Sequence, residues 1–238
     1  MVKVTNKKNR WLNIWEQKGY KLRSSDIDNI IRANGHNSKF SQFNKHSWYK
    51  YIKSLFRRIK INKNYEILEY GCGAGAFLSY WYKKKYRLNG IDYSKTLIKK
   101  AKKYFPKINF VVGEISSIDH FETKFDLIFS HSVFQYFENR VYAKNLLLKM
   151  LKNLKLNGNI CILDVPNAEK EKLFIKKLKK EIGISEFKKK YEKNKHIFYK
   201  KSFFKEFAKK NKLKILIFDH YPIYSENSKY RYNVIFKS

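Results

Sequence analysis

Cysteines are scarce in this chain, and long apolar runs are missing. The two cysteines, Cys72 and Cys161, have neither metal-ligand spacing nor the pattern of a disulfide framework, so we expect no metal site. No stretch approaches the roughly 18 consecutive apolar residues that a membrane-spanning helix needs. The first ten residues are polar and lysine-rich with no apolar run behind them, which argues against a secretory signal. We therefore expect a cytoplasmic chain with no membrane contact.

Arginine is also scarce, although the chain is strongly basic. Only 8 of the 53 basic residues are arginine, and the formal net charge is +33. A charge of this size is typical of nucleic-acid binders, yet arginine is the residue preferred for paired contacts to phosphates and bases. Lysine, asparagine, isoleucine, tyrosine and phenylalanine, all with A/T-rich codons, are abundant. Genomic base composition therefore explains the charge better than a nucleic-acid partner does.

Alternating strand and helix patterns begin at residue 65. We expect strands over 65–70, 87–92, 108–112, 125–130, 158–165, 213–219 and 231–237. Helices are expected over 76–84, 96–104, 140–154 and 202–211. This alternation predicts an α/β domain, with a mostly parallel sheet and helices on both faces. The last two strands have only a loop between them, which favours an antiparallel hairpin.

Two segments lie outside this alternation. Residues 1–64 show helical periodicity over 40–61 and predict an N-terminal helical cap on the substrate side. Residues 65–238 form the predicted domain, and within it residues 169–199 are a charged helical insertion. Insertions after the fifth strand overhang the carboxyl ends of the strands, so we expect this one to form a substrate lid.

Three glycines at alternate positions, Gly71, Gly73 and Gly75, lie between the first strand of this domain and the following helix. Glycines there permit a tight turn and a close approach of ligand to backbone. Asp92 follows about 20 residues later, as a dinucleotide-binding fingerprint also requires. The loop alone therefore leaves two cofactor classes open.

The acids around the loop favour one of these classes. Glu69 precedes the first glycine by two residues, where a carboxylate would repel a pyrophosphate and attract a cationic sulfonium with a free amino group. Glu114 follows the third strand and is placed to accept a hydrogen bond from an adenine amino group. The fourth strand opens with a further acid, Asp126.

Together these segments resemble the class I S-adenosylmethionine-dependent methyltransferases over about residues 65–165. The resemblance implies a Rossmann-like, seven-stranded methyltransferase sheet with an antiparallel last strand, and S-adenosyl-L-methionine as cofactor. It places the glycines along the methionine moiety, Asp92 at the ribose, and Glu114 with Ile115 at the adenine. The cofactor-binding residues that it implies are Glu69, Gly71, Gly73, Gly75, Asp92, Tyr93, Glu114, Ile115 and Ser130.

The methyl acceptor is less constrained. Residues 130–137 lack the Asn/Asp-Pro-Pro-aromatic signature of enzymes that methylate exocyclic or amide nitrogens. A hydroxyl acceptor needs a general base, and we favour His131 over Asp164 and His196 because it lies just past the fourth strand. Tyr199 and Arg231 are the candidates for binding substrate.

A narrower resemblance is to small methyltransferases of bacterial surface-polysaccharide biosynthesis. It implies an oxygen of a sugar, or of a phosphorylated or nucleotide-linked capsule or O-antigen precursor. The lysines of the insertion favour such an anionic small molecule. Two alternatives stay open: an RNA methyltransferase, and a non-enzymatic nucleic-acid-binding protein on the same fold. No appended RNA-binding module is visible, and the intact acids and glycines argue against a non-enzymatic role.

Overall fold

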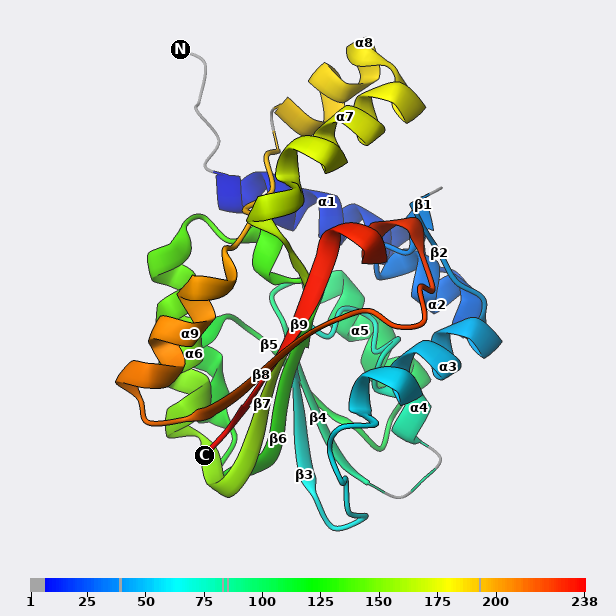
Figure 1. Ribbon diagram of the computed structural model, residues 1–238. Coiled ribbons are helices and arrows are strands. Elements are labelled where there is room, and N and C mark those ends of the chain that lie inside the picture. Colours follow the sequence, from blue (N-terminus) through cyan, green and yellow to red (C-terminus); the bar gives the residue numbers. More distant parts are fainter. Residues whose placement is uncertain (1–6, 39, 83, 85, 193) are drawn as a thin grey trace, which may run out of the picture.

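Seven strands form one sheet through the centre of the molecule (Figure 1). The computed structural model describes residues 7–238 except 39, 83, 85 and 193. The strands are β3 (Glu66–Tyr70), β4 (Arg87–Asp92), β5 (Asn109–Val112), β6 (Phe125–His131), β7 (Leu154–Pro166), β8 (Lys214–Asp219) and β9 (Arg231–Lys237). Their order is β5-β4-β3-β6-β7-β9-β8, and β9 runs antiparallel to both of its neighbours while the other pairs are parallel. The predicted fold class is confirmed.

Helices cover both faces of the sheet, as the alternating pattern predicted (Figure 1). One face packs against α2 (Ile27–Ala33), α3 (Lys45–Phe56), α4 (Ser79–Tyr82) and α5 (Lys95–Tyr104). The other packs against α6 (Arg140–Lys152) and α9 (Lys201–Lys210). Adjacent residues of β6 show why: Leu127 and Phe129 enter the first core, and Ile128 enters the second. Successive side chains of a strand point to opposite faces, so a strand buried on both sides is apolar throughout.

Two predicted helices are shorter than expected. The helix expected over 40–61 is α3 alone, because Asn44 caps its N-terminus by accepting a hydrogen bond from the backbone of Ser47. A two-residue pair of strands, β1 (Asn37–Ser38) and β2 (Ser41–Gln42), precedes it. The helix expected over 76–84 is reduced to α4, since the glycine loop continues as turns as far as Leu78.

The N-terminal helix and the insertion lie at the same end of the sheet (Figure 1). α1 (Lys7–Lys21) crosses this end, and α7 (Glu171–Ile182) and α8 (Ile184–Phe187) stand beyond it. The insertion has a small apolar core of its own, in which Phe174, Leu178, Phe187 and Phe198 meet Phe40 from the segment between β1 and β2. Across the described part of the chain, no helix is long and apolar enough to cross a membrane.

Candidate cofactor and acceptor site

The glycine loop begins where β3 ends. The backbone N–H groups of Gly71 and Cys72 both donate to the carbonyl of Ile91 at the end of β4, at 2.7 and 3.0 Å. Gly71 has φ +79°, and a Cβ there would lie 2.4 Å from the Val133 side chain. Because of this left-handed backbone and close approach, a larger residue would displace the segment after β6. The glycine therefore lets the ends of β3 and β6 meet.

Asp92 ties the end of β4 to this loop. Its Oδ2 accepts from Gly73 N at 2.8 Å and its Oδ1 from Ser94 N at 2.9 Å. The side chain is buried, and burial raises the pKa of Asp92 to about 6, although the two N–H groups act in the opposite direction. One carboxylate thus orders the loop and also lines the pocket beside it.

Glu69 is a buried carboxylate without a full set of partners. Its Oε2 has no hydrogen-bond partner among the residues that the structure describes. Burial, and then the nearby charge of Asp92, raise the pKa of Glu69 well above its usual range. An unpaired buried acid is costly, and a ligand carrying an ammonium and a sulfonium would relieve that cost. The buried acids around the loop therefore fit S-adenosylmethionine.

The N-terminal segment closes this loop from the outside, which the sequence did not indicate. Asn34, after α2, accepts from Ala74 N and donates to the carbonyl of Cys72, both at 2.9 Å. Trp48 of α3 donates from Nε1 to the carbonyl of Ala76 at 3.0 Å. The sequence does not indicate these contacts of Asn34, because a contact over some forty positions has no local pattern.

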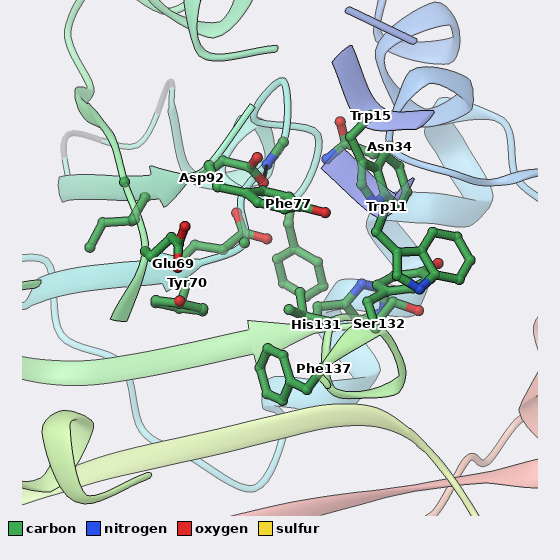
Figure 2. A pocket seen from close by; sticks show the side chains of 18 of the residues that line it. Trp11, Trp15, Asn34, Glu69, Tyr70, Phe77, Asp92, His131, Ser132 and Phe137 are labelled. Carbon is green, nitrogen blue, oxygen red and sulfur yellow. Dashed lines mark hydrogen bonds between the residues drawn. The ribbon is translucent and has the colours of Figure 1, made fainter. Parts of the chain in front are cut away.

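One pocket of about 970 Å³, counting its open mouth, lies against the glycine loop. Glu69, Tyr70 and Asp92 lie toward one side of it, and Trp11 and Trp15 of α1 toward the other (Figure 2). Its remaining lining residues are Asn34, His36, Trp48, Gly71, Gly73, Phe77, Ile91, Tyr93, Gly113, Glu114, His131, Ser132, Val133, Tyr136, Phe137, Glu138 and Tyr142.

His131, the last residue of β6, is part of the pocket wall. Its Nε2 lies 2.9 Å from the hydroxyl of Tyr51, and its ring packs on Phe77 and Trp48 with centroid distances of 4.9 and 5.5 Å. Burial lowers the pKa of His131 to about 3, with a partial opposing effect from Asp164. The ring is therefore neutral at physiological pH, and no described residue hydrogen-bonds to its Nδ1.

Asp164 and Arg231 form an ion pair behind this wall. Arg231 Nη1 lies 2.7 Å from Asp164 Oδ2, the Ser132 hydroxyl donates to the same oxygen, and His220 Nε2 lies 3.5 Å from Oδ1. Burial would raise the pKa of Asp164, but Arg231 and then His220 outweigh it and hold that pKa well below its usual range. Asp164 is thus ionised, and Arg231 is already paired with this carboxylate. Neither residue lines the pocket.

Two further predicted residues lie outside the pocket. The hydroxyl of Tyr199, expected at the substrate, is buried and donates to the carbonyl of Phe134 at 3.0 Å. The ring of His196 packs on Trp11 and Tyr136, at 5.6 and 5.4 Å, on the outer side of residues that do line the pocket.

The expected cofactor residues are brought together in most cases. Glu69, Gly71, Gly73, Asp92, Tyr93 and Glu114 all line the pocket. Gly75 lies beneath the loop, where a Cβ would be 3.1 Å from Phe105. Ser130 is buried, and its hydroxyl has no described partner. The side chain of Ile115 lies outside the described residues.

Comparison with known proteins agrees with this site. The methyltransferase domain family matches residues 61–222. The chain therefore belongs to that family, and S-adenosyl-L-methionine is its cofactor. Malonyl-[acyl-carrier protein] O-methyltransferase 1 of Ilyobacter polytropus is 33% identical over 94 residues, which are 37% of this chain and 35% of that protein. A putative methyltransferase of Invertebrate iridescent virus 6 is 25% identical over 117 residues, 48% of this chain and 44% of that protein. The matched stretches thus span less than half of these curated relatives.

Solved structures share the fold over nearly the whole chain. The plantazolicin methyltransferase BpumL, in complex with a pentazolic desmethylPZN analogue and S-adenosylhomocysteine, has a TM-score of 0.63 at 20% identity, and the match covers 96% of this chain and 99% of that one. Magnesium protoporphyrin IX methyltransferase from Synechocystis has a TM-score of 0.63 at 11% identity and covers 98% of both chains. None of the relatives described here is named as a methyltransferase of surface polysaccharides, so that narrower resemblance is not supported.

Proposed function

We propose that this enzyme transfers the methyl group of S-adenosylmethionine to an oxygen atom of a small acceptor, and that His131 accepts the acceptor's proton. The observation that carries the proposal is the setting of His131. It lies in the pocket wall with Nε2 bonded to Tyr51 and no described partner at Nδ1. An imidazole held in this way has one nitrogen anchored and the other available to a ligand.

Tyr51 acts as a positioning residue in this proposal. For Nδ1 to accept a proton, Nε2–H must donate to the Tyr51 oxygen, and this bond would fix both the tautomer and the ring orientation. Burial lowers the pKa of His131 to about 3, so the imidazole is neutral at physiological pH and can accept a proton, but it is a weak base. Asp164 is a poorer candidate for the base, because its carboxylate is paired with Arg231.

The cofactor end of the pocket would hold the methyl donor beside this histidine. When bound, the cofactor supplies an electrophilic methyl carbon on a positively charged sulfur. Glu69 would face its cationic methionine end, Asp92 its ribose hydroxyls and Glu114 its adenine. Gly71 touches Val133, two residues beyond His131, so the glycine loop and the base lie close together. That proximity supplies the alignment that an in-line methyl transfer requires.

The sequence favoured an oxygen of a sugar, or of a phosphorylated or nucleotide-linked precursor, as the acceptor. The site supports an oxygen nucleophile through His131, but not an anionic group inside the pocket. Among the described lining residues there is no lysine or arginine, and Arg231 is occupied by Asp164. A phosphate group of the acceptor would have to stay outside the pocket, toward residues 169–199. The role of these residues as a substrate lid is part of this proposal.

A variant series tests the role of His131. With an acceptor found by screening hydroxyl compounds against labelled S-adenosylmethionine, His131→Ala should lower turnover by about 10²–10⁴-fold. Its affinity for S-adenosylhomocysteine should stay close to that of the unmodified protein. Tyr51→Phe, which removes only the hydroxyl, should give a smaller loss of turnover.

His196→Ala is the matched control, since it removes an imidazole on the outer side of Trp11 and Tyr136. It should keep turnover within a few-fold of normal. If His131→Ala keeps full turnover, the proton goes elsewhere and the proposal fails.

A further inference from the structure

The two ends of the pocket differ in charge. The lining contains four acids, Glu69, Asp92, Glu114 and Glu138, of which the first three are accounted for by the cofactor. No lysine or arginine is among the described lining residues, although the chain holds 53 of them. One cation, Lys18 of α1, lies with its Nζ 4.7 Å from the ring centroid of Trp15 but is not among the lining residues, so the lining itself offers an acceptor no positive charge.

The acceptor end is built from aromatic rings. Trp11 and Trp15 of α1 pack on Tyr136 with centroid distances of 4.5 and 5.4 Å. Nearer the sheet, Trp48 packs on His36 at 4.6 Å and on His131 at 5.5 Å. All of these residues line the pocket. Such rings offer faces and edges to a planar ligand, and aromatic pairs add stabilisation beyond their buried area.

The histidines of this end carry no charge. Burial lowers the pKa of His36 to about 4, and its Nδ1 lies 2.6 Å from the Ser41 hydroxyl. His131 is neutral for the same reason. A base whose pKa is so low is matched better to a phenol, with a pKa of about 10, than to an aliphatic alcohol, since phenols release a proton far more readily.

This inference rests on the proposed function. We propose that the acceptor is an uncharged phenol, with its ring against the tryptophans and Tyr136 and its hydroxyl at His131. An anionic acceptor would lose its water without gaining a cation. A cationic acceptor would lie beside a positively charged sulfonium, with Glu138 as the lining carboxylate that the cofactor does not use. The aromatic end therefore selects for an uncharged ring.

Three matched phenols test this selection. 4-Ethylphenol is neutral, tyramine adds an ammonium to the same skeleton, and 4-hydroxyphenylacetate carries a carboxylate. Calorimetry with protein saturated with S-adenosylhomocysteine gives the affinity of each, and labelled S-adenosylmethionine reports methyl transfer. We expect 4-ethylphenol to bind about tenfold more tightly than either charged analogue, because burial penalises an unpaired charge. Methyl β-glucopyranoside and glucose 1-phosphate are the sugar probes, the first neutral and the second anionic.

Trp15→Lys should narrow or reverse the preference for 4-ethylphenol over 4-hydroxyphenylacetate, because it places a cation in the pocket lining, whereas Lys18 lies outside that lining. Trp15 is only half-buried, so the change is compatible with folding. Asn13→Lys adds the same charge at an exposed position of α1 and should leave the preference unchanged.

The inference is overturned if a charged phenol or glucose 1-phosphate binds as tightly as 4-ethylphenol, or if 4-ethylphenol does not bind up to its solubility limit. Methylation of a sugar probe alone would overturn it while leaving the proposed function intact. Failure to bind S-adenosylhomocysteine at all would remove the proposed function itself.

Discussion

Asn34→Ala should weaken both the fold and cofactor binding, because Asn34 links the N-terminal segment to the glycine loop. The substitution removes two hydrogen bonds of 2.9 Å, one from Ala74 N and one to the carbonyl of Cys72. A hydrogen bond contributes about 0.5–1.5 kcal/mol net, so the pair accounts for about 1–3 kcal/mol. In a chain of this size, that loss lowers the melting temperature by about 2–4 °C per kcal/mol.

Part of the same loss should appear in affinity, since a loosened loop must be ordered again when the cofactor binds. If half of this cost falls on binding, the dissociation constant for S-adenosylhomocysteine rises about two- to twelvefold. Thermal unfolding and calorimetric titration measure the two quantities separately. Asn34→Asp keeps an acceptor for Ala74 N but sets a carboxylate oxygen against the carbonyl of Cys72, so it should cost at least as much as Asn34→Ala.

Asn29→Ala is the matched control, because Asn29 lies in α2, just before Asn34 in the chain, and its side chain bonds to Asp26 and Arg32 instead of the glycine loop. It should change cofactor affinity by less than about twofold. If Asn34→Ala melts and binds cofactor like the unmodified protein, the N-terminal segment does not support the loop and the reasoning fails.

Two further predictions concern the buried carboxylates. Burial raises the pKa of Asp92 to about 6, and the ionised form accepts hydrogen bonds from the ribose hydroxyls. Affinity for S-adenosylhomocysteine should therefore fall as the pH drops through about 6, and calorimetry that shows constant affinity from pH 8 to pH 5 would contradict this role. Asp164→Ala should lower the free energy of unfolding by about 3–5 kcal/mol, because it leaves Arg231 buried without its partner. Asp164→Asn should cost less, since asparagine tolerates the φ of +60° at this position. Urea unfolding that finds Asp164→Ala as stable as the parent protein would refute the account of this ion pair.

The sheet and the cofactor end of the site could be predicted because their signals are local. Strand, glycine turn and helix follow one another within about a dozen residues, and the acids that bind the cofactor lie at or just after strand ends. Glu69, Asp92 and Glu114 therefore arrive at one edge of a parallel sheet once the strand order is known.

The acceptor end could not be predicted, because long-range packing creates it. Trp11 and Trp15 belong to a helix whose docking the sequence does not encode in any short pattern. Arg231 was expected to face substrate, yet it pairs with Asp164, 67 positions away, and is thereby buried. Tyr199 was expected there too, but its hydroxyl is satisfied by a backbone carbonyl in the core. A polar residue near a loop indicates a binding site only if no other group of the protein already pairs with it.

Calorimetric titration of the purified chain with S-adenosylmethionine, S-adenosylhomocysteine and NAD tests whether the glycine loop and its acids bind a sulfonium cofactor. Both sulfur ligands should bind and NAD should not. Glu69→Gln should weaken the binding of both sulfur ligands because it removes the charge that faces their ammonium group. Binding of NAD without binding of either sulfur ligand would contradict the account.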